Sequence, residues 1–246
     1  MSIVRPARAG APTAPGGERG LAIAIVWMLG ALLSFAGMAV GIRTVGDTLG
    51  TFEILTFRSA IGLVLVAAIV AWRGRRGPAL LATRQPVRQV TRNLVHFGGQ
   101  YLWTYGLTIL PLSVVTALEY TNPVWSSLLA VLMLGERFTP GRAIALGAGL
   151  LGVIVILRPG LAVIDPASFL VLLAALLYAY AHIAGKILVR TDTPLAVVFY
   201  MALVQLPLAA IPAAFAWVTP EPWDYPWLVL IGIGGMASHY CLSEAF

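Results

Sequence analysis

Charged residues are scarce in this chain. Asp, Glu, Lys and Arg make up 11% of the 246 residues, whereas a soluble domain carries about 25%. Apolar residues reach 59%. This balance excludes a soluble globular domain and predicts an all-α integral membrane protein. The chain also has a single cysteine, Cys241, which excludes an internal disulfide framework and a cysteine-based metal site.

The usual signatures of an enzyme or a metalloprotein are missing as well. The sequence has only three histidines, and none occurs in the H-E-x-x-H spacing of a zinc enzyme. It shows no pairing of a nucleophile with a base and no aspartate-rich cation motif. We therefore expect no metal, no cofactor and no enzymatic activity. An integral membrane enzyme is the alternative from another functional class.

Long apolar runs are what the chain has in abundance. Hydropathy divides it into eight apolar segments, separated by turn residues or charges. They run approximately over 20–42, 53–72, 93–111, 112–134, 140–157, 166–186, 194–217 and 226–246. A helix needs about 20 apolar residues to cross a bilayer, so we expect about eight transmembrane helices. Residues 1–19, with Arg5, Arg8 and Arg19 among Ala, Pro and Gly, are expected to form a disordered basic tail.

Basic residues fall almost entirely on one side of this predicted bundle. The side that holds the N-terminus receives Arg5, Arg8, Arg19, Arg73, Arg75, Arg76, Arg84, Arg88, Arg92, Arg137, Arg142, Lys186 and Arg190. The other side receives only Arg43 and Arg158. Because Lys and Arg are concentrated in cytoplasmic loops, we expect a multi-pass protein of the cell (inner) membrane with a cytoplasmic N-terminus. This placement also accounts for the net charge of +6 without a nucleic-acid partner.

The chain contains an internal repeat. Ala31-Leu32-Leu33 recurs as Ala175-Leu176-Leu177, Trp72 as Trp217, and Gly98-Gly99 as Gly234-Gly235. The first copy, 20–157, has five segments, so this odd number inverts the second copy, 166–246, which has three. Inverted repeats are typical of secondary transporters, with the substrate site near the bilayer midplane. Because nothing matches the last two segments of the first copy, the repeat predicts that two spans are missing after Phe246.

The segment 112–134 carries a carboxylate and a helix breaker in its middle. Pro123 cannot donate a hydrogen bond to the carbonyl of Glu119, four residues earlier. Lipid satisfies neither that carbonyl nor the carboxylate, so both should face protein or a water-filled cavity. We predict a helix break at Pro123 and a substrate site at Glu119, which could exchange protons or bind a cationic group. A structural hydrogen bond to Arg58 or to a tyrosine is the alternative.

Aromatic and polar side chains of other segments are candidate partners of Glu119. Trp103 and Tyr105 could form a stacking wall for a planar or cationic substrate, or simply a packed helix interface. His182 could accept a proton. The predicted substrate-binding residues are Gln100, Tyr101, Trp103, Tyr105, Glu119, Tyr120, Asn122, Tyr178, His182 and His239. By contrast, we expect the side chain of Arg58 to extend toward the outer membrane interface. We expect His96 to lie at the membrane interface near the loop 73–92, which we call the arginine-rich loop.

The sequence resembles the drug/metabolite transporter superfamily, and specifically its EamA-type transporters. The resemblance is carried by Phe57-Arg58, Trp103-Thr104-Tyr105-Gly106-Leu107, Pro123, Leu134-Gly135-Glu136-Arg137, Gly147 and Gly152. It implies two inverted five-helix repeats in a ten-helix fold, alternating access and no metal cofactor. Ala181-His182 and His239-Tyr240 are similar to the branch that contains S-adenosylmethionine uptake transporters. Glu119 departs from the pattern, because many relatives have a small or apolar residue there.

These patterns lead to one functional expectation. They favour a secondary transporter of a small organic metabolite that is cationic or amphipathic, such as S-adenosylmethionine. Efflux of drugs or amino acids by the same fold is the alternative. The expected partners are the substrate and the lipid bilayer. Protons are the candidate coupling ion, and a second copy of the chain is a candidate partner in a homodimer.

Overall fold

The computed structural model describes residues 17–137, 139–157 and 165–245, and these form helices without a strand. The helices are α1 (Gly17–Val45), α2 (Thr51–Trp72), α3 (Pro86–Ile109), α4 (Leu112–Glu119), α5 (Asn122–Leu134), α6 (Pro140–Leu157), α7 (Ala167–Leu188), α8 (Pro194–Ala213) and α9 (Tyr225–Ala245). Two short 3₁₀ turns, η1 (Gly74–Arg76) and η2 (Pro78–Leu81), connect α2 to α3. Most of the expected basic tail lies outside the described residues, and α1 begins at Gly17.

Five of the described helices are long and apolar enough to cross a membrane, namely α1 from Ala22 onward, α2, α7, α8 and α9. The remaining helices are too short or too polar to meet this criterion of length and apolar character. Helix α6 is apolar but shorter, and α4 and α5 are two short pieces of one expected segment. Helix α3 is long enough, but polar residues occupy one of its faces.

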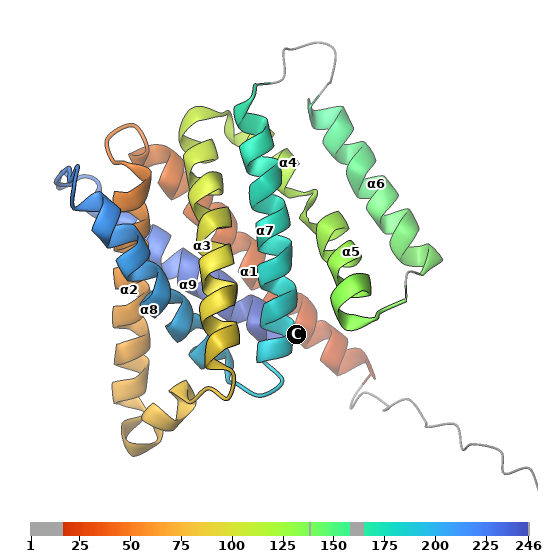
Figure 1. Ribbon diagram of the computed structural model, residues 1–246, viewed down its shortest axis with the longest axis horizontal. Coiled ribbons are helices and arrows are strands. Elements are labelled where there is room, and N and C mark those ends of the chain that lie inside the picture. Colours follow the sequence, from red (N-terminus) through yellow and green to blue (C-terminus); the bar gives the residue numbers. More distant parts are fainter. Residues whose placement is uncertain (1–16, 138, 158–164, 246) are drawn as a thin grey trace, which may run out of the picture.

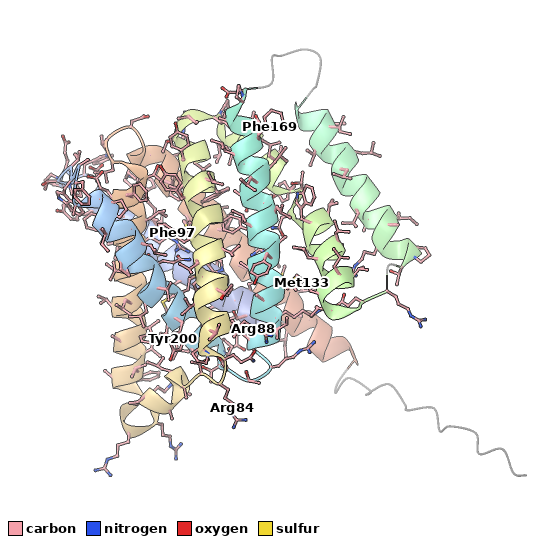
Figure 2. All side chains as sticks on the ribbon, in the orientation of Figure 1. Arg84, Arg88, Phe97, Met133, Phe169 and Tyr200 are labelled. Carbon is pink, nitrogen blue, oxygen red and sulfur yellow. The ribbon has the colours of Figure 1, made fainter. Side chains whose placement is uncertain are left out.

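The connections between helices gather at two ends of the bundle (Figure 1). One end holds the connections 73–85 and 189–193, and Arg84 and Arg88 lie there in Figure 2; we call it the basic end. The connections 46–50 and 214–224 lie at the other end, which we call the opposite end. Helices α4 and α5 follow one another in the same direction, from the opposite end toward the basic end.

Helices far apart in the sequence form the core of the bundle. Helix α1 packs against α9, α3 against α7, and α2 against α8, while α4 and α5 lie along α7 (Figure 1). The apolar core between them includes Met38, Ile42, Trp103, Val171 and Ile231. Helix α6 lies at the edge of the bundle, and most of its side chains are exposed.

Small residues let α1 and α9 approach closely. A Cβ atom added to Gly41 would lie 2.9 Å from Cγ1 of Ile231, and one added to Gly234 would lie 2.8 Å from the carbonyl oxygen of Ser34. Neither position has room for a methyl group. Such close packing of small residues is a main source of helix association where lipid surrounds the protein.

Candidate functional site

Glu119 is the last residue of α4, and its side chain is partly buried. Its Oε2 atom accepts a hydrogen bond of 2.9 Å from the indole Nε1 of Trp103 on α3. The Trp103 side chain is fully buried. A charge-assisted bond of this kind offsets part of the cost of removing a carboxylate from water. Whatever the protonation state of the acid, it is held toward the protein interior by an aromatic donor, and no bond joins it to Arg58 in the part of the chain that the structure describes.

The chain breaks directly after Glu119. Residues 120–121 lie between α4 and α5, and Pro123 occupies the first turn of α5, where a missing N–H costs nothing. The side-chain amide of Asn122 donates to the carbonyl oxygen of Ala175 at 2.9 Å. This bond fixes the start of α5 on α7. Tyr120, at the break itself, is 59% exposed.

One face of α3 is polar and yet buried. Gln89, Asn93, His96, Gln100 and Thr104 follow one another at steps of three or four residues, so they share a stripe. Each of them is at most 1% exposed. The stripe faces α7 and α8 rather than solvent, because these helices pack against α3, and His96 reaches His239 on α9. Thus α3 brings a row of hydrogen-bonding groups through the centre of an otherwise apolar bundle.

An oriented chain of hydrogen bonds crosses this row. Nη1 of Arg58 donates to Oε1 of Gln205 at 3.4 Å, and Nε2 of Gln205 lies 2.7 Å from Nδ1 of His96. Nδ1 is then the acceptor, which places the proton of His96 on Nε2. That atom lies 3.2 Å from Nε2 of His239, which accepts in turn. Both imidazoles are neutral in this arrangement, and the chain links α2, α8, α3 and α9.

Aromatic rings connect the histidine pair to the carboxylate. The ring of Tyr178 on α7 lies 5.1 Å from that of His96 and 6.5 Å from that of Trp103, centroid to centroid. On its other side the ring stacks on His182 at 6.2 Å, with planes 11° apart. Trp103, Tyr178, His182 and His239 therefore belong to one continuous cluster with Glu119. The side chain of Gln100 is buried on the same stripe of α3 and makes no hydrogen bond.

Two predicted site residues lie elsewhere. Tyr101 and Tyr105 stack on each other, with centroids 6.4 Å apart, and Phe52 packs against Tyr101. All three line a cavity of about 330 Å³ at the opposite end, together with Glu53 and Thr108. The hydrogen bond to Glu119 therefore comes from Trp103, while the tyrosines of α3 point from the same helix into this separate cavity.

Three polar residues occupy positions that the sequence did not suggest. Arg58 was expected to snorkel, but it is 4% exposed and bonded to Gln205. His96 was expected at the membrane interface, but it is fully buried. Arg92 was assigned to the arginine-rich loop, but it is 3% exposed and donates to Oδ1 of Asn93 at 2.8 Å. These expectations were wrong because proximity to the loop in sequence was taken for exposure, whereas the polar stripe of α3 faces inward from its first turn.

A carboxylate at each end of the bundle joins the two halves of the chain. At the basic end, Asp192 accepts hydrogen bonds from Thr83, from the backbone of Arg84 at 3.2 Å and from Gln89 at 2.9 Å. At the opposite end, Glu53 accepts from the backbone of Gly50 at 2.6 Å and from that of Val218. In each case a backbone N–H of the other half of the chain is one of the donors.

The charge state of Asp192 follows from these bonds. Burial by itself would raise the pKa of the Asp192 carboxyl, but the hydrogen bonds that it accepts, first from Thr83 and Gln89, outweigh burial and lower this pKa below its ordinary value. The residue is therefore ionised at neutral pH. The same end carries Glu136, whose carboxylate pairs with Lys186 at 2.8 Å and with Arg142 at 3.0 Å.

The residues that the structure describes offer no group of three or more His, Cys, Asp or Glu that could hold a metal ion. What they offer is a cluster with hydrogen-bond donors, acceptors and stacking surfaces, in which Arg58, Arg92, His96 and His239 are buried and His182 is partly buried. Such a cluster can bind and orient a small polar molecule once the bundle opens.

Comparison with known proteins places these features in a family. The EamA-like transporter family matches residues 22–158. An S-adenosylmethionine uptake transporter of Rickettsia prowazekii is 30% identical over 223 residues, which cover 90% of this chain and 74% of the relative. A riboflavin transporter of Brucella anthropi is 29% identical over 185 residues, or 74% of this chain and 64% of the relative.

A solved crystal structure has the same fold. It superposes with a TM-score of 0.70 at 20% identity, covering 94% of this chain and 80% of the other. The apolar helices, the match over more than half of the sequence and the similarity to named transporters agree with one another. This chain is a multi-pass membrane protein that belongs to the EamA-like transporter family.

Proposed function

We propose that this protein is a secondary transporter that moves a small organic metabolite across the membrane by alternating access. The observation that carries this proposal is the buried cluster in which Trp103 holds the Glu119 carboxylate at 2.9 Å. Ionisable groups inside membrane helices cost on the order of 2.5–3.5 kcal/mol on insertion scales and mark substrate or ion pathways. Tyr178, His182, His239 and Gln100 complete the proposed site, with Asn122 fixing the broken helix beside it.

The pairing of helices supports an inverted repeat. If α1, α2 and α3 correspond to α7, α8 and α9, a two-fold relation exchanges the α1–α9 contact with the α3–α7 contact and maps the α2–α8 contact onto itself. All three contacts are present. We therefore propose eight membrane crossings, in which α4 and α5 together make one crossing and the site lies between the repeats.

The similarity to S-adenosylmethionine uptake transporters supports that metabolite as the first substrate to test. It is an organic cation with a planar adenine ring, which suits an acid beside aromatic side chains. In this proposal Tyr101 and Tyr105 line the entrance at the opposite end, and Tyr120 flanks the break in the fourth crossing. Efflux of drugs or amino acids by the same architecture is the competing assignment.

We place the basic end in the cytoplasm of a bacterial-type inner membrane, because Lys and Arg concentrate on cytoplasmic sides. Glu119 and the His96–His239 pair are the groups through which protons could be coupled to transport.

Reconstitution tests the proposal directly. Proteoliposomes that contain the protein should take up radiolabelled S-adenosylmethionine with saturable kinetics, and unlabelled substrate inside should accelerate this uptake. Uptake that rises linearly with concentration and equals that of empty liposomes would contradict transport of this metabolite. Chemical conversion of the compound by detergent-purified protein would instead indicate a membrane enzyme.

A further inference from the structure

Among the residues that the structure describes, two arginines in the centre of the bundle have no acidic partner. Arg58 and Arg92 are 4% and 3% exposed. Within the described residues, the only ion pairs join Glu136 to Arg142 and Lys186, and they lie at the basic end. An unpaired guanidinium is costly in an apolar interior. Charged residues inside membrane helices therefore usually serve a substrate or ion that supplies the missing partner.

The free donors of Arg58 lie on one edge of its guanidinium. Nη1 is the atom that reaches Gln205, and at 3.4 Å the bond is long. Nε and Nη2 are buried and have no partner. These two neighbouring N–H groups form the fork that binds a carboxylate through two parallel hydrogen bonds. The geometry is that of a half-made carboxylate site.

The surroundings of Arg58 also favour an anion. Nδ2 of Asn93 and Nε2 of Gln100 are further buried donors without a partner. Arg92 adds a second positive charge beside Asn93, to which it donates at 2.8 Å. Gly235 of α9 packs against this same edge of the guanidinium, because a Cβ atom there would lie 2.4 Å from Nε and 3.1 Å from Nη2 of Arg58. Two guanidinium groups and an unpaired amide donor therefore lie around Gln205 and Asn93.

We propose that Arg58, supported by Arg92 and Asn93, binds a carboxylate of the transported metabolite. The substrate then carries a carboxylate, which lies at Arg58 in the bound state. This inference rests on the proposed transport function, and S-adenosylmethionine, which carries a carboxylate, satisfies it.

A first experiment tests the anion site without assuming the substrate. Thermal unfolding of the detergent-purified full chain is measured in acetate, phosphate and chloride at equal ionic strength. Acetate should stabilise the wild type relative to chloride, and Arg58→Gln should lose this effect. Arg190→Gln removes a charge from an exposed position and should retain it. Equal unfolding in all three salts would overturn the proposal, and a preference for phosphate over acetate would overturn the carboxylate assignment.

A second experiment uses two ligands that differ only in the carboxylate. In proteoliposomes the wild type should prefer S-adenosylmethionine over its decarboxylated form by at least about tenfold, the value of one hydrogen bond to a charged group. Arg58→Gln should erase this preference by slowing only the carboxylate-bearing compound. An equal loss for both compounds would overturn the proposal while leaving transport intact. If the wild type transports neither, the assigned substrate fails and the acetate experiment alone decides the arginine site.

Two further variants separate binding from folding. Arg58→Lys keeps the charge but loses the fork, so it should fold like the wild type and recover the preference only in part. Gly235→Ala leaves Arg58 in the sequence but displaces its guanidinium, and it should reduce the preference as Arg58→Gln does. Gly37→Ala is the matched control, because nothing lies within 4 Å of a Cβ atom there. An unchanged preference in Gly235→Ala would contradict the placement of the carboxylate.

Discussion

The indole N–H of Trp103 donates to the carboxylate of Glu119, with 2.9 Å between Nε1 and Oε2. The two residues are 16 positions apart and belong to different helices, α3 and α4. The bond fixes the direction of an acid at the only point where the described fourth segment is interrupted. The strength of this hydrogen bond and the protonation of Glu119 can be examined separately.

Trp103→Phe should destabilise the protein by removing the donor while keeping a large ring. The loss leaves a partly buried carboxyl group without its donor, which costs about 1–3 kcal/mol. Trp125→Phe is the control, because Nε1 of Trp125 is buried without a partner and nothing is lost with it. Thermal unfolding measures the stability of both variants. It is followed by circular dichroism, because this signal does not rely on tryptophan fluorescence. Equal midpoints for the two variants would show that the bond does not stabilise the fold.

Glu119→Gln keeps an acceptor for Trp103 but removes the group that can exchange a proton. We expect slower substrate uptake and a flatter dependence of the rate on pH than in the wild type. Glu221→Gln is the control, because Glu221 is exposed at the opposite end. Initial rates in proteoliposomes over a pH series provide the measurement. Identical kinetics at every pH would remove Glu119 from the mechanism.

His239→Phe should leave the Nε2 proton of His96 without an acceptor. The cost of a buried unpaired donor is about 1–3 kcal/mol. His182→Phe is the comparison, because His182 stacks on Tyr178 and a phenyl ring can keep that contact. Thermal unfolding at neutral pH should show a larger loss for His239→Phe. A larger loss for His182→Phe would contradict the proposed direction of the hydrogen-bond chain.

Asp192→Asn should lower the free energy of unfolding and make it depend less on pH in the acidic range. The pKa of Asp192 is lowered in the native state, so its stabilisation is fully present above the ordinary value of 3.8 and is lost as the pH falls through the lower native value. We expect a loss of about 1–3 kcal/mol at neutral pH. The difference from the wild type should shrink in acid. Asp47→Asn, at an exposed position, should change neither the unfolding midpoint nor its slope with pH.

The helices of this fold could be predicted from the sequence because apolar length is a local property. The break in the segment 112–134 followed from Pro123 for the same reason, and the structure places it at 120–121. The inward-facing polar stripe of α3 was harder to predict. Arg92 and His96 are close in sequence to exposed arginines, and only the spacing of the polar residues on α3 indicates that they face inward.

Partners across the bundle could not be predicted at all. Gln205 is one polar residue in an apolar helix, and its bonds to Arg58 and His96 depend on helices more than 100 positions away. The direction in which the Tyr105 side chain points was equally hard to predict. It shares a helix with Trp103, but two residues turn a helical side chain by more than half a circle, so Tyr105 faces the cavity at the opposite end.

Glu53 and Asp192 connect the two halves of the chain at opposite ends of the bundle. Each accepts a hydrogen bond from a backbone amide of the other half of the chain. In the proposed alternating-access cycle, one of these contacts opens while the other stays closed, and a leak would require both to open at once. Loss of Asp192 should therefore shift the resting population toward exposure of the basic end, and loss of Glu53 should shift it the other way, with neither change abolishing the barrier to free diffusion.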